Sequence, residues 1–286
     1  MPFPNHPCFN PAARHRVGRI HLPVAAECNV QCNFCNRDYA CVNESRPGVT
    51  GAVLTPEAAA DYLDAVLVKI PTIAVVGVAG PGDPFASPAE TLATLRLVRE
   101  RHPEKILCLA SNGLAVAEHA AALADLNVSH VTLTVNAVDP EIGAQIYAWI
   151  RVPPHLYRGA AGAAVLLERQ TAALTALAER GITVKVNTVV IPGVNEQHAA
   201  AVAAYAAKHG AQIQNCIPLM RVNGSAFVGI EPPTNAAMQE TRRQAGEFLP
   251  QMSHCGRCRA DAAGMLGENN SPVVGELLTA AAKKKD

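Results

Sequence analysis

Short apolar stretches alternate with longer amphipathic ones along most of the chain. Stretches of six to nine residues rich in Val, Ile, Leu and Ala are typical of buried strands, whereas apolar residues three and four positions apart are typical of helices. The pattern predicts strands at residues 19–25, 72–79, 105–110, 130–138, 183–191 and 211–219. It predicts helices at residues 56–70, 88–102, 115–126, 139–150 with 162–180, 196–209 and 234–249.

Helix starts in the sequence agree with this alternation. Thr55 precedes a proline at the start of one predicted helix, which is a favoured first turn. At the start of the next helix, Ser87 and Glu90 have the spacing of a capping box. Helices are therefore expected to begin just after Thr55 and Ser87, where the spacing of apolar residues becomes that of a helix.

Strand–helix units in series predict parallel strands joined by right-handed crossovers. The two further strands that a closed eight-unit barrel needs are not found, so the predicted fold is an α/β partial (β/α)6 barrel. Functional loops are expected at the carboxyl ends of its strands. The predicted organisation is an N-terminal arm at 1–18, the barrel at 19–250 and a C-terminal extension at 251–286, with both extensions irregular.

Composition narrows the class of protein. The 286 residues are 49% apolar, and 24 basic side chains balance 24 acidic ones, so no charge excess favours nucleic acid or an anionic membrane. No apolar run approaches the roughly 18 residues that a membrane helix needs, and the start lacks a signal-peptide pattern. We therefore expect a cytoplasmic protein, in which nine cysteines more often bind metal or catalyse than form disulfides.

Four of the cysteines are crowded into one loop directly after the first predicted strand. Cys28, Cys32 and Cys35 form a C-x3-C-x2-C pattern, and Cys41 follows six residues later. Three thiolates on a four-iron cluster would leave one iron open for a ligand. A zinc knuckle or a group of redox-sensitive thiols is the alternative interpretation.

This cysteine spacing at the end of a first strand resembles that of the radical S-adenosylmethionine (SAM) superfamily, whose core fold is also a partial barrel. The resemblance implies that the three cysteines hold a 4Fe–4S cluster whose open iron chelates SAM. One electron then cleaves SAM to methionine and a 5′-deoxyadenosyl radical. Phe34, just before the last cysteine, corresponds to the aromatic residue that packs near the adenine.

Segments at later strand ends resemble the SAM-contacting segments of the same superfamily. They are "AGPGDPF", "ASNG", a position near the end of the fourth strand, and "VNTVVIPGVNE". Taken singly, each could be an ordinary turn, because Gly and Pro are common at strand ends. The SAM-binding residues that the resemblance implies are Gly80, Gly82, Asp83, Asn112, Asn136, Asn187 and Ile191.

Longer strings narrow the resemblance to the NifB family, the radical SAM maturases of nitrogenase cofactor assembly. These strings are "RIHLPVAAECNVQCNFCNRDYACVNESRPGV", "TVNAVDPEIGAQIYAWI" and "HCGRC". The resemblance implies two further 4Fe–4S clusters, K1 and K2, which are fused with a SAM-derived carbide and an added sulfide into an eight-iron core. The additional cluster ligands that it implies are Cys8, His21, Cys41, Cys108, Cys255 and Cys258.

Strand alternation gives independent reasons for two of these ligands. Ile20, Leu22 and Val24 share one face of the first strand, which suits covering helices, so His21 faces the barrel interior. Cys108 points inward if its face of the third strand does. The alternatives are a hydrogen-bonded core histidine for His21 and an apolar filler for Cys108, and Cys216 is interpreted as packing.

Other roles are less specific in the sequence. Asp38, Glu44 and Arg46 flank the cysteine loop and are candidates for moving protons or binding the anionic clusters. The resemblance also implies an electron donor, an iron–sulfur cluster donor and a cofactor-accepting scaffold protein as partners, and a stand-alone form without a C-terminal cofactor-binding domain. The competing hypotheses are a radical SAM enzyme with auxiliary clusters that acts on a peptide or nucleotide, and a non-catalytic iron–sulfur scaffold.

Overall fold

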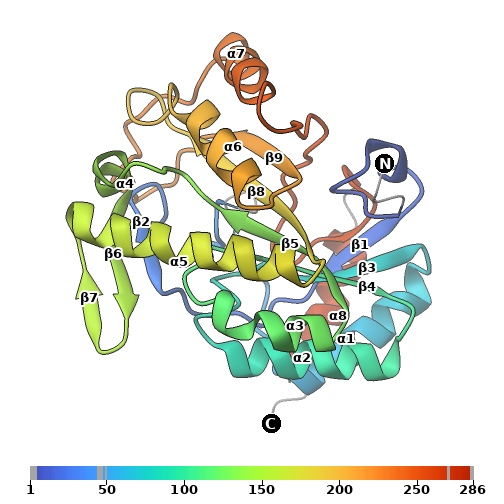
Figure 1. Ribbon diagram of the computed structural model, residues 1–286. Coiled ribbons are helices and arrows are strands. Elements are labelled where there is room, and N and C mark those ends of the chain that lie inside the picture. Colours follow the sequence, from blue (N-terminus) through green and yellow to red (C-terminus); the bar gives the residue numbers. More distant parts are fainter. Residues whose placement is uncertain (1–4, 44–47, 49, 269–270, 284–286) are drawn as a thin grey trace.

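A curved sheet with helices on its outer face forms the centre of the molecule (Figure 1). The computed structural model describes residues 5–43, 48, 50–268 and 271–283. The order of the sheet is β10-β1-β3-β4-β5-β8-β9, and all neighbours are parallel except β10, which is antiparallel to β1. The strands are β1 Gly18–His21, β3 Ile73–Val78, β4 Ile106–Ser111, β5 Val128–Thr134, β8 Thr183–Val190, β9 Ile213–Pro218 and β10 Ala263–Gly264.

Helices lie between successive parallel strands along the chain, and others follow the last of these strands. They are α1 Pro56–Lys69, α2 Pro88–Arg101, α3 Ala120–Asp125, α4 Pro140–Ile146, α5 Gly159–Glu179, α6 Ala199–Lys208, α7 Asn235–Ala245 and α8 Ser271–Lys283, with short 3₁₀ turns η1 Pro11–Ala13 and η2 Ala117–His119. The hydroxyl of Thr55 accepts a hydrogen bond from the Ala58 N–H at 3.2 Å, as expected of a cap. Ser87 makes no such bond, so the predicted capping box there is wrong.

The predicted partial barrel is confirmed, because the six predicted strands correspond to the six parallel strands of the sheet. The alternation argument for the first strand also holds. Ile20, Leu22 and Val24 are buried in the main core between the sheet and its helices. Cys216 belongs to the same core, as its interpretation as packing predicted. In the described part of the chain, no helix is long and apolar enough to cross a bilayer.

The prediction of a helix through residue 150 is wrong. Helix α4 ends at Ile146, and the chain continues as β6 Tyr147–Val152. This strand pairs with β2 Val30–Cys32 inside the cysteine loop and with β7 His155–Tyr157. Aromatic and β-branched residues favour strands. Here the pairing with β2, which is distant in sequence, decided between strand and helix. The pairing places Cys32 opposite Tyr147 and ties the cysteine loop to the barrel.

The prediction that residues 251–286 are irregular holds for residues 252–262 and is wrong for the segments that follow. Strand β10 pairs with the outer edge of β1, with Arg19 opposite Gly264. Helix α8 extends to Lys283 and contacts α1, and it buries Val274, Leu278 and Ala281 in the main core. The apolar stripe of α8 therefore packs into the helical layer.

One buried side chain on α5 joins the ends of two central strands. Gln170 is 2% exposed, and its amide donates hydrogen bonds to the carbonyl oxygens of Asn112 and Thr134, each at 2.8 Å. These carbonyls lie at the ends of β4 and β5, where the functional loops begin. A helix on the outer layer thus fixes the start of a loop at the site.

We predict that Gln170→Met lowers the free energy of unfolding by about 1–3 kcal/mol, because it removes the donor that the Asn112 and Thr134 carbonyl groups share. Chemical denaturation measures the change. Gln145→Met is the matched control: Gln145 is exposed, and a change within about 0.5 kcal/mol is expected. Equal effects of the two substitutions would show that the Gln170 clamp contributes nothing to stability.

Candidate functional site

Two neighbouring pockets lie on the concave side of the sheet and at the carboxyl ends of its strands. The first, which we call the cysteine-loop pocket, is lined by all four cysteines of that loop: Cys28, Cys32, Cys35 and Cys41. The second, which we call the barrel pocket, is lined by the other predicted cluster ligands: Cys8, His21, Cys108, Cys255 and Cys258. Ala110, on β4, lines both pockets, so the two are adjacent.

The cysteine loop is fixed to the end of β3 by backbone contacts. The Gly82 N–H donates to the Ala25 carbonyl at 2.6 Å, and the Asp83 N–H donates to the Glu27 carbonyl at 2.7 Å. A Cβ on Gly82 would lie 1.9 Å from the Glu27 carbonyl oxygen, so no other residue fits this position. The backbone just before Cys28 can therefore lie against the end of β3 only because Gly82 has no side chain.

Asp83 organises the neighbouring strand end. Its buried carboxylate accepts hydrogen bonds from the N–H groups of Asn112 at 2.6 Å and Phe85 at 2.9 Å, and from the Ser111 hydroxyl at 3.0 Å. Burial raises the pKa of this carboxyl, while those hydrogen bonds oppose the rise. With its backbone held by Asp83, Asn112 has its side-chain amide 3.9 Å from the Cys28 sulfur and 2.7 Å from the Asn29 side-chain oxygen.

Burial favours the neutral thiol form of Cys28 and Cys32 when no metal is bound. Burial raises the pKa of Cys28 to about 12 and that of Cys32 well above its ordinary value, and the neighbouring cysteines add to the rise for Cys32. The Asn43 amide lies 3.8 Å from the Cys32 sulfur and 3.6 Å from the Cys41 sulfur, where it can donate to thiolates. Soft, crowded thiols of this kind fit an iron–sulfur cluster, whose positive iron would reverse the penalty on the thiolates.

A zinc knuckle is disfavoured. Within the described residues, no three His, Cys, Asp or Glu side chains surround a point that could hold a single metal ion. A zinc ion would need its sulfur ligands about 2.3 Å from one centre. A cluster of several irons spreads its ligands further apart, and the four cysteines of the loop line one pocket.

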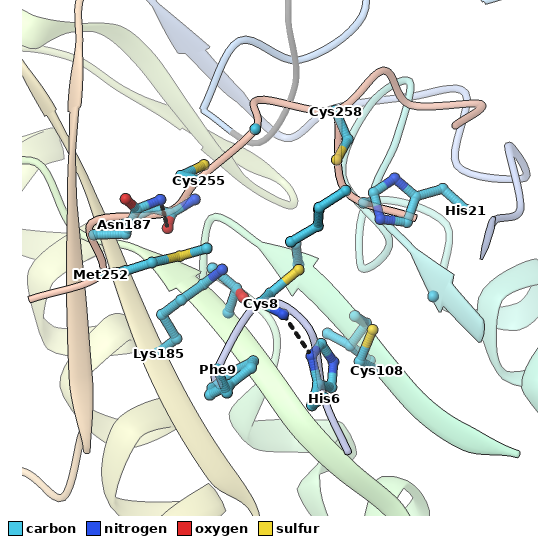
Figure 2. A pocket seen from close by; sticks show the side chains of 18 of the residues that line it. His6, Cys8, Phe9, His21, Cys108, Lys185, Asn187, Met252, Cys255 and Cys258 are labelled. Carbon is cyan, nitrogen blue, oxygen red and sulfur yellow. Dashed lines mark hydrogen bonds between the residues drawn. The ribbon is translucent and has the colours of Figure 1, made fainter. Parts of the chain in front are cut away.

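Strand register brings two predicted ligands of the barrel pocket onto one row of the sheet. Gly77, in the middle of the row, pairs with His21 on one side and with Cys108 on the other. A Cβ on Gly77 would lie 2.9 Å from the Cys108 sulfur and 3.4 Å from the His21 ring. The absence of a side chain at Gly77 therefore gives both ligand candidates their space. Cys8, from the N-terminal arm, and Cys255 and Cys258, from the C-terminal extension, approach from other sides (Figure 2).

The charged side chains that line the barrel pocket are cationic. Lys185 and Arg257 line it, and none of its described lining residues is Asp or Glu. Arg19 is only 3% exposed and donates to the Cys258 sulfur at 2.8 Å. Buried cations next to thiols favour an anionic occupant, such as a cluster with thiolate ligands.

His21 has the ring orientation that a metal ligand needs. Its Nδ1 lies 3.1 Å from the Arg259 carbonyl oxygen, which can only accept, so Nδ1 carries the proton and Nε2 has a free electron pair. Burial lowers the pKa of His21 to about 4, so the ring is neutral at neutral pH. Burial raises the pKa of the Cys8 thiol to about 11.

The structure brings some of the predicted SAM-binding residues to a pocket and not others. Gly82, Asp83 and Asn112 line the cysteine-loop pocket, whereas Asn187 lines the barrel pocket. Four others line neither pocket: Phe34, Gly80, Asn136 and Ile191.

Local packing explains where three of those four side chains lie. Phe34 and Ile191 are fully buried in a second apolar cluster beneath the cysteine loop. The Asn136 side-chain oxygen accepts a hydrogen bond from the Val189 N–H at 2.9 Å.

The positions of the charged residues near the cysteine loop do not support their predicted roles in proton transfer or cluster binding. Asp38 is exposed and lines neither pocket. Glu44 and Arg46 lie outside the described residues.

Sequence reasoning missed several polar residues of the site. Arg19 shares the inward face of its strand with His21, so the same alternation could have found it. Lys185 is a lone cation in an apolar strand, which is a second usable signal. Asn43 and His6 carry no local signal, because only the folded chain brings them to a pocket.

Comparison with known proteins agrees with this geometry. The model of the radical SAM superfamily matches residues 22–206, which include the cysteine loop and most of the barrel. The chain belongs to the radical SAM superfamily. Among solved structures, the FeFe-hydrogenase maturase HydG from Carboxydothermus hydrogenoformans has a TM-score of 0.55 at 14% identity, covering 94% of this chain and 67% of that one. Methylornithine synthase (PylB) has a TM-score of 0.52 at 12% identity, covering 88% and 76%. These two likenesses support the fold alone.

Curated relatives confirm the resemblance to the NifB family. This radical SAM chain is 53% identical over 278 residues to the FeMo cofactor biosynthesis protein NifB of Chlorobaculum tepidum, covering 97% of this chain and 66% of the relative. The NifB protein of Klebsiella pneumoniae is 46% identical, covering 95% and 59%. That of Azotobacter vinelandii is 44% identical, covering 93% and 53%. The chain thus spans between about half and two thirds of the length of these relatives.

We predict that Gly77→Ala disturbs the barrel pocket and leaves the cysteine-loop pocket intact. The added Cβ would force the Cys108 sulfur to rotate away, while the fold loses only about 1 kcal/mol. After anaerobic reconstitution with iron and sulfide, the variant should bind less iron than the wild type but should still bind SAM. Gly229→Ala is the control, because no atom lies within 4 Å of its Cβ position. Full iron content in Gly77→Ala would contradict a role of this gap in placing ligands.

Proposed function

We propose that this radical SAM protein is an enzyme that builds the iron–sulfur precursor of the nitrogenase cofactor. Its reaction would fuse two 4Fe–4S clusters, K1 and K2, with a SAM-derived carbide and an added sulfide into an eight-iron carbide core. The observation that carries the proposal is the barrel pocket: four cysteines and an inward-facing histidine, with buried cations, directly beside the cysteine-loop pocket. Similarity to proteins of FeMo cofactor biosynthesis supports the same assignment.

In this proposal Cys28, Cys32 and Cys35 hold the resident 4Fe–4S cluster, as the residues of their pocket fit. That cluster would chelate SAM at its open iron and supply the electron for its cleavage. The protein's own part is to position SAM: the Asp83 carboxylate fixes the Asn112 backbone, and the Asn112 amide faces the Cys28 sulfur. The burial of this pocket would exclude water from the reaction.

K1 and K2 would be bound as substrates in and beside the barrel pocket. Cys8, His21, Cys108, Cys255 and Cys258 supply five ligands there, and Cys41 supplies a sixth from the cysteine-loop pocket. Six protein ligands for two four-iron clusters leave irons without protein ligands, which suits clusters that must fuse and depart. Arg19 and Lys185 would balance their negative charge.

A peptide or nucleotide substrate is less consistent with the geometry. Such a substrate would have to enter the concave side of the barrel, where the auxiliary ligand set is already gathered. A non-catalytic scaffold would have no use for a SAM-binding pocket beside its clusters. We also propose an electron donor, a cluster donor and a cofactor-accepting scaffold protein as partners, as the resemblance to the NifB family implies.

The proposal predicts that two sets of cysteine variants lose different properties. Replacing Cys28, Cys32 and Cys35 together by Ala should abolish SAM cleavage and retain iron in the barrel pocket. Replacing Cys255 and Cys258 together should lose about one cluster's iron and retain SAM cleavage, because the resident cluster is untouched. Anaerobic iron quantification, EPR and deoxyadenosine measurement distinguish the two patterns.

Cys216→Ala is the matched control, because Cys216 is buried in the apolar core away from both pockets. It should keep iron and SAM cleavage at wild-type values. Deoxyadenosine production by the variant that lacks Cys28, Cys32 and Cys35 would rule out the radical SAM assignment of the loop. Full assembly of the eight-iron product by the Cys255 and Cys258 double variant would rule out their role as cluster ligands.

The shared wall at Ala110 gives a further prediction. Ala110→Leu should place a bulky side chain between the two pockets and separate SAM from the substrate clusters. SAM cleavage should persist while the eight-iron product falls at least about tenfold, since small misplacements of reactants lower rates strongly. Ala110→Ser, nearly the size of Ala, is the control. Wild-type product formation by Ala110→Leu would show that transfer does not pass this wall.

A further inference from the structure

His6 is a buried side chain of the barrel pocket and is not among the proposed cluster ligands. It is 2% exposed and comes from the N-terminal arm, two residues before Cys8. Its Nδ1 accepts a hydrogen bond from the Cys8 backbone N–H at 3.2 Å. Its Nε2 has no hydrogen-bond partner among the described residues. A buried polar atom without a partner next to a pocket requires an explanation.

The Nδ1 contact decides where the proton of His6 lies. A nitrogen that accepts from an N–H carries no proton itself, so the proton of the neutral ring is on Nε2. Nε2 is therefore a hydrogen-bond donor and has no free electron pair for iron. His21 is the opposite case, because its Nδ1 faces the Arg259 carbonyl oxygen and its Nε2 is the acceptor.

Aromatic packing holds the His6 ring in this position. Its centroid lies 4.7 Å from that of Phe9 in an edge-on arrangement and 4.4 Å from that of His130. His130 pairs with Cys108 in the sheet, which places the ring beside the row that carries the ligand candidates (Figure 2). The His6 ring is packed on two sides and hydrogen-bonded at Nδ1, so it cannot flip to exchange the positions of Nδ1 and Nε2.

We propose that His6 donates a hydrogen bond from Nε2 to a sulfur of the cluster that Cys8 binds, and that it is not an iron ligand. The inference rests on the proposed function, since it requires a cluster in the barrel pocket. A cluster bound in the barrel pocket would offer its sulfur atoms as hydrogen-bond acceptors to the Nε2–H of His6. The short segment from His6 to Cys8 would then supply one thiolate ligand and one hydrogen-bond donor to the same cluster.

Such a bond has a measurable consequence. Hydrogen bonds to cluster sulfurs stabilise the reduced, more negative form of a cluster and so raise its reduction potential. Removing the donor should make the potential of that cluster more negative. A side chain that served only to fill space would leave the potential unchanged when replaced by one of similar size.

The test compares His6→Met, which removes the donor, with His6→Gln, which keeps an N–H group at similar reach. In the iron-loaded full chain, pulsed EPR in H2O and D2O should show an exchangeable proton coupled to an auxiliary cluster. That coupling should be lost in His6→Met and kept in His6→Gln, with the potential shifted to more negative values only in His6→Met. Exposed His15→Met is the control and should match the wild type.

The outcomes separate this inference from the proposed function. Unchanged proton coupling and potential in an iron-replete His6→Met would overturn the donor role alone. An imidazole bound to iron would give a strong nitrogen coupling in the pulsed EPR spectrum of the wild type. Loss of that coupling in His6→Met, together with its persistence in His21→Ala, would show that His6 is an iron ligand and overturn the inference. His21→Ala also decides the question if His6→Met does not retain iron. A wild-type protein that binds iron only at the cysteine-loop pocket would overturn the proposed function, and this inference with it.

Discussion

Parallel pairing of the six central strands is the constraint on which the rest of the structure depends. Because all six run in one direction, their carboxyl ends meet at one edge, and their loops converge there. The cysteine loop after β1, the Gly82 turn after β3 and the Asn112 turn after β4 become neighbours for this reason. Their direct contacts, such as the Gly82 N–H on the Ala25 carbonyl, hold the cysteine-loop pocket in shape.

The two faces of the curved sheet have opposite chemistry. The convex face is apolar and packs against the helices, and it supplies most of the burial that stabilises the fold. The concave face carries His21, Cys108 and Lys185 where a closed barrel would carry apolar packing. The concave face therefore contributes the polar lining of a pocket, whereas the convex face contributes the packing that stabilises the fold.

Both ends of the chain close the barrel pocket. The N-terminal arm brings Cys8, and the C-terminal extension brings Cys255 and Cys258. The His254 ring lies 2.9 Å from the Pro7 carbonyl oxygen, and Arg19 on β1 donates to the Cys258 sulfur. Segments about 240 residues apart thus form one wall, so ligand placement depends on the completed fold.

The sequence by itself determined the six strand–helix units, the cysteine loop and the inward direction of His21. Each of these follows from a short-range period or spacing, which neighbouring residues fix. The tertiary structure decided which distant groups meet. It placed Cys41 with the first three cysteines and Asn187 in the other pocket, and it left Phe34, Asn136 and Ile191 in the core. It also turned the end of a predicted helix into β6 through pairing with β2, and an expected irregular tail into β10 and α8. The physical reason is that a local pattern sets the face on which a side chain lies, whereas long-range pairing and packing set its partners.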